Sequence, residues 1–186
     1  MSHLILFIMR RIILIITSLF VYSAFALADK LEDRYVMKIF DEGQLYFILP
    51  FEIQTQTNKV KPLSVDITYL TTADSITMNM SVLTMKELNT DSVVLEGENK
   101  VVIPDFQTFF IEKEGKYWFH RYSIQIPYCQ FMQFYSATKP LHIEIHSATQ
   151  CIQYGYTQTQ WNKDRIWMLQ IIKIMENNKR LLNNKR

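Results

Sequence analysis

Apolar and polar residues alternate with a period of two through much of the chain, and this pattern restricts the fold more than any other feature. Val65, Ile67 and Tyr69 alternate with polar residues, and segment 76–82 repeats the pattern after a short polar turn at 72–75. Successive side chains of a strand point to opposite faces, so the pattern predicts strands with one buried and one wet face. The two segments are therefore expected to form an antiparallel hairpin.

Three of the four glycines support the same interpretation, because each stands between two apolar runs. They are Gly43, Gly97 and Gly115. A glycine in this position is typical of a hairpin turn. Three such places in one domain predict an antiparallel, mostly meandering β-sheet.

Two segments depart from the strand pattern. In 127–137 polar residues recur every three positions, and Pro127 suits the first turn of a helix, so a short helix is expected there. The segment that begins at Asn162, a candidate N-cap, has a narrow polar stripe, which predicts a long and largely buried C-terminal helix. Residues 181–186 are expected to form a solvated basic tail.

These elements predict an α+β fold. In it, the antiparallel sheet carries the short helix near 127–137 and the long C-terminal helix, both packed on one face. The alternative is a two-sheet β-sandwich with the last helix as a lid. Residues 29–180 are enough for a single domain with its own hydrophobic core.

The first 28 residues have the features of a secretory signal peptide. Arg10 and Arg11 precede an almost wholly apolar run, 12–22, and small residues follow at 26–28. This pattern predicts cleavage after Ala28 and an exported domain in the periplasm or at the cell surface. Met9 is an alternative start of the chain. The alternative to a cleaved signal peptide is a retained membrane anchor, although the apolar run is shorter than the ~20 residues that a membrane span requires.

Removal of this segment changes the charge balance. The chain has 20 Lys and Arg residues and 18 Asp and Glu residues, and Arg10 and Arg11 would leave with the signal peptide. The remaining charges are 18 of each sign. A neutral domain gives no reason to expect nucleic acid or an acidic membrane as a partner. We expect membrane contact only through the signal segment before cleavage.

The two cysteines, Cys129 and Cys151, both lie in the expected mature domain. Two cysteines in a protein exported to an oxidising compartment predict one disulfide bond. The alternative is two free thiols.

One segment carries residues of the kind that bind metals. His142, Glu144 and His146 alternate along a predicted strand, so their side chains share a face and are spaced by about 7 Å per step. Imidazole and carboxylate groups are zinc ligands, so zinc is the one cofactor that the sequence suggests. The alternative is the wet face of an amphipathic strand without a cofactor.

Other chemical motifs are missing from the sequence. It contains no G-x-S-x-G, no C-x-x-C, no H-E-x-x-H and no glycine-rich phosphate-binding loop. His120 lies between Trp118 and Tyr122 on a predicted apolar face, which is typical of a buried core histidine.

Aromatic residues near the C-terminal helix suggest a binding surface. Tyr154, Tyr156 and Trp161 could form a platform for a carbohydrate or a peptide, because exposed aromatic side chains are effective interface anchors. The alternative is packing in the core, which we expect for Trp118 and Trp167.

Taken together, the sequence favours a non-catalytic exported domain that binds a protein, peptide or glycan partner. One alternative is a metal-dependent hydrolase that uses His142, Glu144 and His146. Another is a structural subunit of an envelope assembly, joined to its neighbours by strand addition at exposed sheet edges.

Overall fold

The computed structural model describes residues 31–55 and 61–183. The predicted signal peptide and its cleavage site at Ala28 lie outside these residues. The chain divides into two compact units, Met1–Tyr35 and Val36–Arg186. Almost all described residues belong to the second unit, which is described by itself below.

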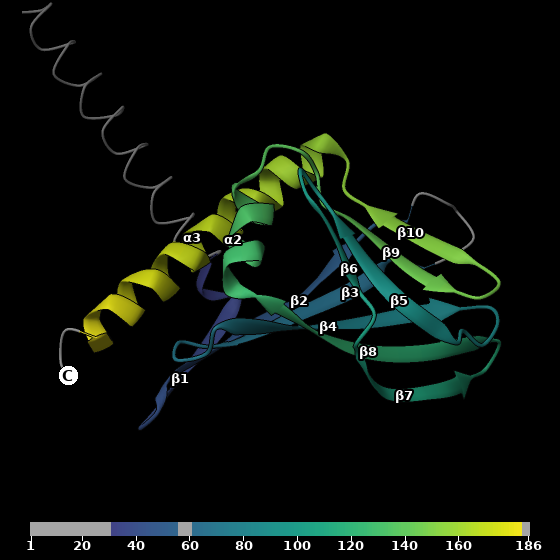
Figure 1. The fold of residues 1–186 in the computed structure, drawn as a ribbon, viewed down its shortest axis with the longest axis horizontal. Coiled ribbons are helices and arrows are strands. Elements are labelled where there is room, and N and C mark those ends of the chain that lie inside the picture. The colour runs from purple at the N-terminus through teal and green to yellow at the C-terminus, as the bar shows by residue number, and fades with distance from the viewer. Residues whose placement is uncertain (1–30, 56–60, 184–186) are drawn as a thin grey trace, which may run out of the picture. The chain divides into compact units, whose positions relative to one another are not determined.

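The strands form two antiparallel sheets, labelled as in Figure 1. The six-stranded sheet contains, in spatial order, β1 (Tyr35–Phe40), β2 (Gly43–Ile53), β3 (Leu63–Leu70), β4 (Ser75–Thr84), β8 (Tyr117–Pro127) and β7 (Gln107–Glu114). The four-stranded sheet contains β10 (Cys151–Gly155), β9 (His142–Ser147), β5 (Thr90–Glu96) and β6 (Lys100–Ile103). The helices are α2 (Tyr128–Ser136) and α3 (Gln158–Asn183).

This architecture confirms the α+β prediction, but the strands do not form one meander. After β4 the chain leaves the first sheet to form β5 and β6, and it returns to that sheet with β7 and β8. As a result β4 pairs with β8, and β5 pairs with β9. The predicted hairpins are present, whereas the pairing between distant strands divides them between two sheets.

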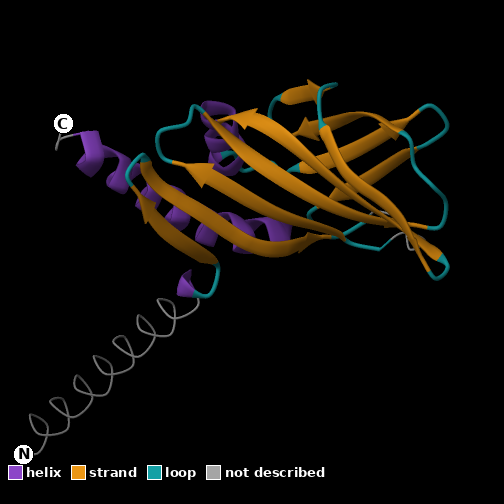
Figure 2. Ribbon diagram, turned by 90° about the horizontal axis from the view of Figure 1, so that it is seen from below, coloured by secondary structure: helices purple, strands orange, loops and turns teal. Residues whose placement is uncertain are grey.

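Both helices lie on one side of the six-stranded sheet (Figures 1 and 2), and the side chains on that face of the sheet are apolar. Helix α2 packs against β4, β8 and α3, and helix α3 packs against β2. The alternation of the strands places the following residues on this buried face: Tyr46, Ile48, Val65, Ile67, Tyr69, Met78, Met80, Tyr122, Ile124 and Ile126. Burial of this stripe is the main source of stability of the fold.

The outer face of the central strands β3, β4 and β8 is polar. The Arg121 guanidinium donates hydrogen bonds to Asp66 and to Ser81, both at 2.6 Å. Asn79 Nδ2 donates to the other Asp66 oxygen at 2.7 Å. These cross-strand contacts join β3, β4 and β8 on a face that is partly exposed to solvent.

Helix α2 confirms the predicted short helix, and Pro127 directly precedes it. Helix α3 begins at Gln158 rather than after Asn162, because Thr157 acts as the cap: its Oγ1 accepts a hydrogen bond from the Gln160 amide at 3.2 Å. The helix also continues to Asn183, so the expected solvated tail is helical through its first half.

Contacts with the sheet explain why the C-terminal part of α3 does not fray. Asn178 donates a hydrogen bond to the hydroxyl of Tyr46, and Lys179 donates to the hydroxyl of Tyr69 at 3.4 Å. These tertiary contacts hold α3 against the sheet just before residues 181–186, the predicted solvated tail.

The two sheets are joined at one end through β2 and β10. The amide of Gly155 donates a hydrogen bond to the carbonyl of Gln54 at 2.9 Å, and Thr55 forms an isolated bridge with Tyr154. These bonds partly cover the edge of the four-stranded sheet at β10.

Neither helix of the described chain combines the length and the apolar character that a membrane crossing would need.

Candidate functional site

The hairpin of β9 and β10 carries the one cluster of potential metal ligands among the described residues. Its turn is closed by a backbone hydrogen bond from the Ser147 amide to the Gln150 carbonyl at 2.9 Å. The Ser147 hydroxyl reinforces the turn by bonding to Gln150 at 3.0 Å. The resulting register places Cys151 directly opposite His146, and Gln153 opposite Glu144.

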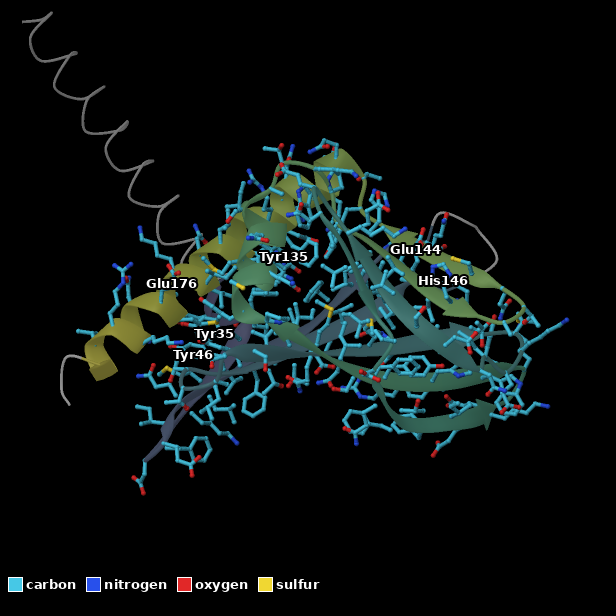
Figure 3. All side chains as sticks on the ribbon, in the orientation of Figure 1. Tyr35, Tyr46, Tyr135, Glu144, His146 and Glu176 are labelled. Carbon is cyan, nitrogen blue, oxygen red and sulfur yellow. The ribbon has the colours of Figure 1, made fainter. Side chains whose placement is uncertain are left out.

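Three potential ligand atoms converge on the exposed face of this hairpin. Nε2 of His146 lies 2.9 Å from Oε2 of Glu144 and 3.7 Å from Sγ of Cys151. All three ligand atoms lie within 4.8 Å of one another. Gln153 Nε2 donates a hydrogen bond to the second oxygen of Glu144 at 2.9 Å and so orients the carboxylate. Figure 3 shows Glu144 and His146 side by side, far from Tyr135 at the helices.

The cluster changes the proton affinities of its members. The hydrogen bond with His146, the largest cause, lowers the pKa of the Glu144 carboxyl. Burial, the largest cause, and the negative charge of Glu144 raise the pKa of the Cys151 thiol. These shifts favour the protonated thiol of Cys151, which must lose its proton before it can bind an ion.

The geometry also differs from that of a Cys–His–acid triad. In such a triad the acid bonds to one ring nitrogen of the histidine, and the nucleophile bonds to the other. Here Glu144 and Cys151 both approach Nε2 of His146. The arrangement can hold an ion between three ligands, but it does not relay a proton from the thiol.

The structure brings together two of the three predicted metal ligands and replaces the third. Glu144 and His146 converge, while His142 lies outside the cluster, opposite Gly155 on β10 and Glu96 on β5. Cys151 takes the third position. The strand that carries Cys151 was not predicted, because its alternating pattern spans only five residues.

The predicted disulfide bond is wrong, because Cys129 and Cys151 are both free and exposed. Cys129 lies in the first turn of α2, whereas the hairpin register holds Cys151 opposite His146 in the four-stranded sheet. The spacing of two cysteines in the sequence does not report which elements carry them.

The predicted aromatic platform is also wrong, because Tyr154, Tyr156 and Trp161 are all buried. Trp161 stacks on Tyr135 at 5.4 Å between ring centroids and contacts Tyr156 at 5.2 Å. Trp161 Nε1 also donates a hydrogen bond to the Ala137 carbonyl at 3.3 Å. The three side chains join α2, α3 and β10 in the core rather than binding a ligand.

His120 is fully buried, which confirms the prediction of a core histidine. Its Nε2 lies 2.9 Å from Thr84 Oγ1, and its Nδ1 lies 3.2 Å from the Tyr122 hydroxyl. Burial, the largest cause, lowers the pKa of the imidazole, so the ring is neutral and structural.

A second candidate site is the apolar edge strand β1, which contains none of the predicted site residues. Strand β1 is the end strand of the six-stranded sheet. Four of its side chains are exposed and apolar: Val36 (44 %), Met37 (38 %), Ile39 (73 %) and Phe40 (51 %). Because consecutive side chains alternate, both faces of the strand are apolar and accessible.

The neighbouring strand extends this apolar surface. Leu45, Phe47 and Leu49 alternate with the buried residues of β2 and are half-buried or exposed. The Lys38 ammonium lies over the ring of Phe47, 5.8 Å from its centroid. A depression of 390 Å³ beside the turn is lined by Phe40, Asp41, Glu42, Leu45 and Leu70. We call strand β1 from Val36 onward, together with Leu45, Phe47 and Leu49, the β1 surface.

Comparison with known proteins identifies no relative: no protein-family model, no curated protein and no solved structure matches the chain.

Proposed function

We propose that this chain is a non-catalytic exported domain that binds an extended segment of a partner protein along strand β1. The observation that carries the proposal is the exposure of apolar side chains on both faces of an edge strand. A segment that pairs with such an edge makes backbone hydrogen bonds along the strand and buries side chains on both faces of the sheet.

The other sheet edges are less suited to this role. Strand β7 ends in the charged run Glu112–Glu114, which discourages pairing with another strand. Strand β6 is only four residues long. Strand β10 is partly covered by its bridge with Thr55. Strand β1 has a single charged side chain, Lys38, among its exposed apolar residues.

The chemistry of the β1 surface suggests the character of the partner. The exposed residues favour a partner segment with apolar side chains on both of its faces. Asp41 and Glu42 at the edge of the depression favour a basic side chain beside that segment. A protein or peptide partner is preferred to a glycan, because the aromatic residues suggested for glycan binding, Tyr154, Tyr156 and Trp161, are buried.

The proposal is tested by affinity capture from the envelope fraction of the source organism. The bait is the protein recovered after expression of the full-length chain, either unchanged or as Ile39→Lys. A charge placed in an apolar interface costs more than 1.4 kcal/mol, so Ile39→Lys should reduce capture of the partner by at least about tenfold.

The matched control is Val102→Lys, because Val102 on edge strand β6 is also exposed (57 %) and apolar. This variant should capture the same partner as the unchanged protein. Equal capture by the Ile39→Lys bait would contradict the proposal. Sedimentation measures the oligomeric state of the purified protein. A dimer would show that the partner is a second copy of the chain, and a monomer would show that it is another protein.

A further inference from the structure

We infer that the β9–β10 hairpin binds a zinc-class divalent ion through Glu144, His146 and Cys151. This inference is independent of the proposed partner binding, because the cluster lies on the four-stranded sheet and strand β1 lies on the other sheet.

The separations of the ligand atoms fit one ion. Bonds of about 2.0–2.3 Å and a tetrahedral angle require about 3.3 Å between nitrogen and oxygen ligands and about 3.6 Å between nitrogen and sulfur. The corresponding separations here are 2.9 Å for Glu144 and His146, and 3.7 Å for His146 and Cys151. The third pair, Glu144 and Cys151, lies within 4.8 Å, so side-chain rotations would bring all three atoms to bonding distance of a single ion.

Strand pairing and hydrogen bonds position the ligands. Cross-strand pairing fixes Cys151 opposite His146, and the Ser147–Gln150 turn closes the hairpin directly beside them. The hydrogen bond from Gln153 holds Glu144 by the oxygen that faces away from His146. Such a supporting partner orients a ligating carboxylate and raises metal affinity.

The ligand types select the ion. A thiolate, an imidazole and a carboxylate favour zinc and chemically similar ions such as Co²⁺, whereas Mg²⁺ and Ca²⁺ prefer sites made of oxygen atoms. The cluster lies on the exposed face of the hairpin, and Cys151 is itself exposed. Three protein ligands leave the fourth tetrahedral position accessible to water or to a group from another molecule.

The inference is tested by titrating the protein obtained from the full-length chain with Co²⁺, under reducing conditions, followed by competition with Zn²⁺. We expect one bound ion and the ultraviolet charge-transfer band of a cobalt–thiolate bond. Cys151→Ser should remove this band, and Cys151→Ser and His146→Ala should each weaken Zn²⁺ binding by at least about tenfold. Glu144→Gln keeps the size of the side chain and should also weaken binding.

Two control variants remove residues of the same types. Cys129→Ser removes the other free thiol, and His142→Ala removes the other histidine of β9. Both should leave the cobalt spectrum and the zinc affinity unchanged. Circular dichroism and thermal unfolding check that every variant is folded.

Three results would overturn the inference. They are the absence of a thiolate band in the unchanged protein, unchanged zinc affinity in folded Cys151→Ser, or equal losses in His142→Ala and His146→Ala. The last result would restore the ligand set that the sequence suggested.

Discussion

The outer face of the six-stranded sheet has two regions that differ in chemistry. Over β3, β4 and β8 the face is polar, and Asp66, Asn79 and Arg121 form hydrogen bonds across the strands. Over the β1 surface the same side of the sheet is apolar, with Leu45, Phe47 and Leu49 accessible. Both regions belong to one sheet, and Figure 2 views that sheet from the side opposite the helices.

The difference shows which apolar residues the fold requires. The polar region proves that a strand of this sheet can be stable with a wet outer face, because its buried face supplies the packing. Strand β1 differs from these strands, because both of its faces are largely exposed and its apolar side chains therefore bury little surface within the described domain. Apolar residues that add little to folding and remain in water are best explained by a contact with another molecule.

The largest expected effect concerns the inner face of the hairpin that carries the β1 surface. Tyr46 is fully buried and accepts a hydrogen bond from Asn178 of α3. Tyr46→Ala should lower the free energy of unfolding by about 3–5 kcal/mol, as is typical for a large aromatic core residue. Urea denaturation followed by circular dichroism measures this change.

The control for this prediction is Ile39→Ser, because Ile39 lies on the same hairpin but is mostly exposed. It should change the free energy of unfolding by less than about 0.5 kcal/mol. If Ile39→Ser lowered the free energy of unfolding as much as Tyr46→Ala, the exposed side chains of β1 would stabilise the fold. The contrast drawn between the polar region and the β1 surface would then be wrong.

A smaller effect is expected in the polar region. Asp66→Ala removes the carboxylate that pairs with Arg121 at 2.6 Å and that accepts a hydrogen bond from Asn79. Hydrogen bonds to charged groups contribute about 1.5–3 kcal/mol, so the free energy of unfolding should fall by about that amount. Urea denaturation again provides the measurement.

The double variant Asp66→Ala/Arg121→Ala tests whether the contact itself is responsible. Its loss should be smaller than the sum of the two single losses, because the pair is removed without leaving one charge unpaired. Strict additivity would show that the polar region is held by strand packing alone.

The smallest effect on stability is expected at the β1 surface itself. Ile39→Lys should change the free energy of unfolding by less than about 0.5 kcal/mol, since the side chain is 73 % exposed. It should also reduce the fluorescence of a dye that binds exposed apolar surface. An unchanged dye signal together with a large loss of stability would remove the β1 surface as a candidate docking site.

Much of the fold could be predicted because its signals are local. The alternation at Val65, Ile67 and Tyr69 correctly indicated which side chains are buried, and the departure from this pattern at 127–137 located α2. The start of α3 was predicted less well, because Thr157 and Asn162 are both suitable caps. The structure uses Thr157, whose Oγ1 accepts a hydrogen bond from the Gln160 amide, and Trp161 is buried in the first turn that follows.

The candidate sites could be predicted only in part. The strand pattern placed Glu144 and His146 on one face, and their convergence follows from the period of a strand. The third member of the cluster, Cys151, comes from the partner strand, so it depends on a register that no local pattern reports. The burial of Tyr154 and Tyr156 depends likewise on which elements cover β10.

The sequence by itself determined most of the strands, the short helix and the polarity of most strand faces, because periodicity is a property of contiguous residues. The tertiary structure decided that β4 pairs with β8, that β5 pairs with β9, and that β1 is an end strand of the six-stranded sheet. The reason is physical: ladder hydrogen bonds join backbone groups, which are the same at every residue. The choice of partner strand therefore depends on the packing of the whole domain, and both candidate sites depend on that choice.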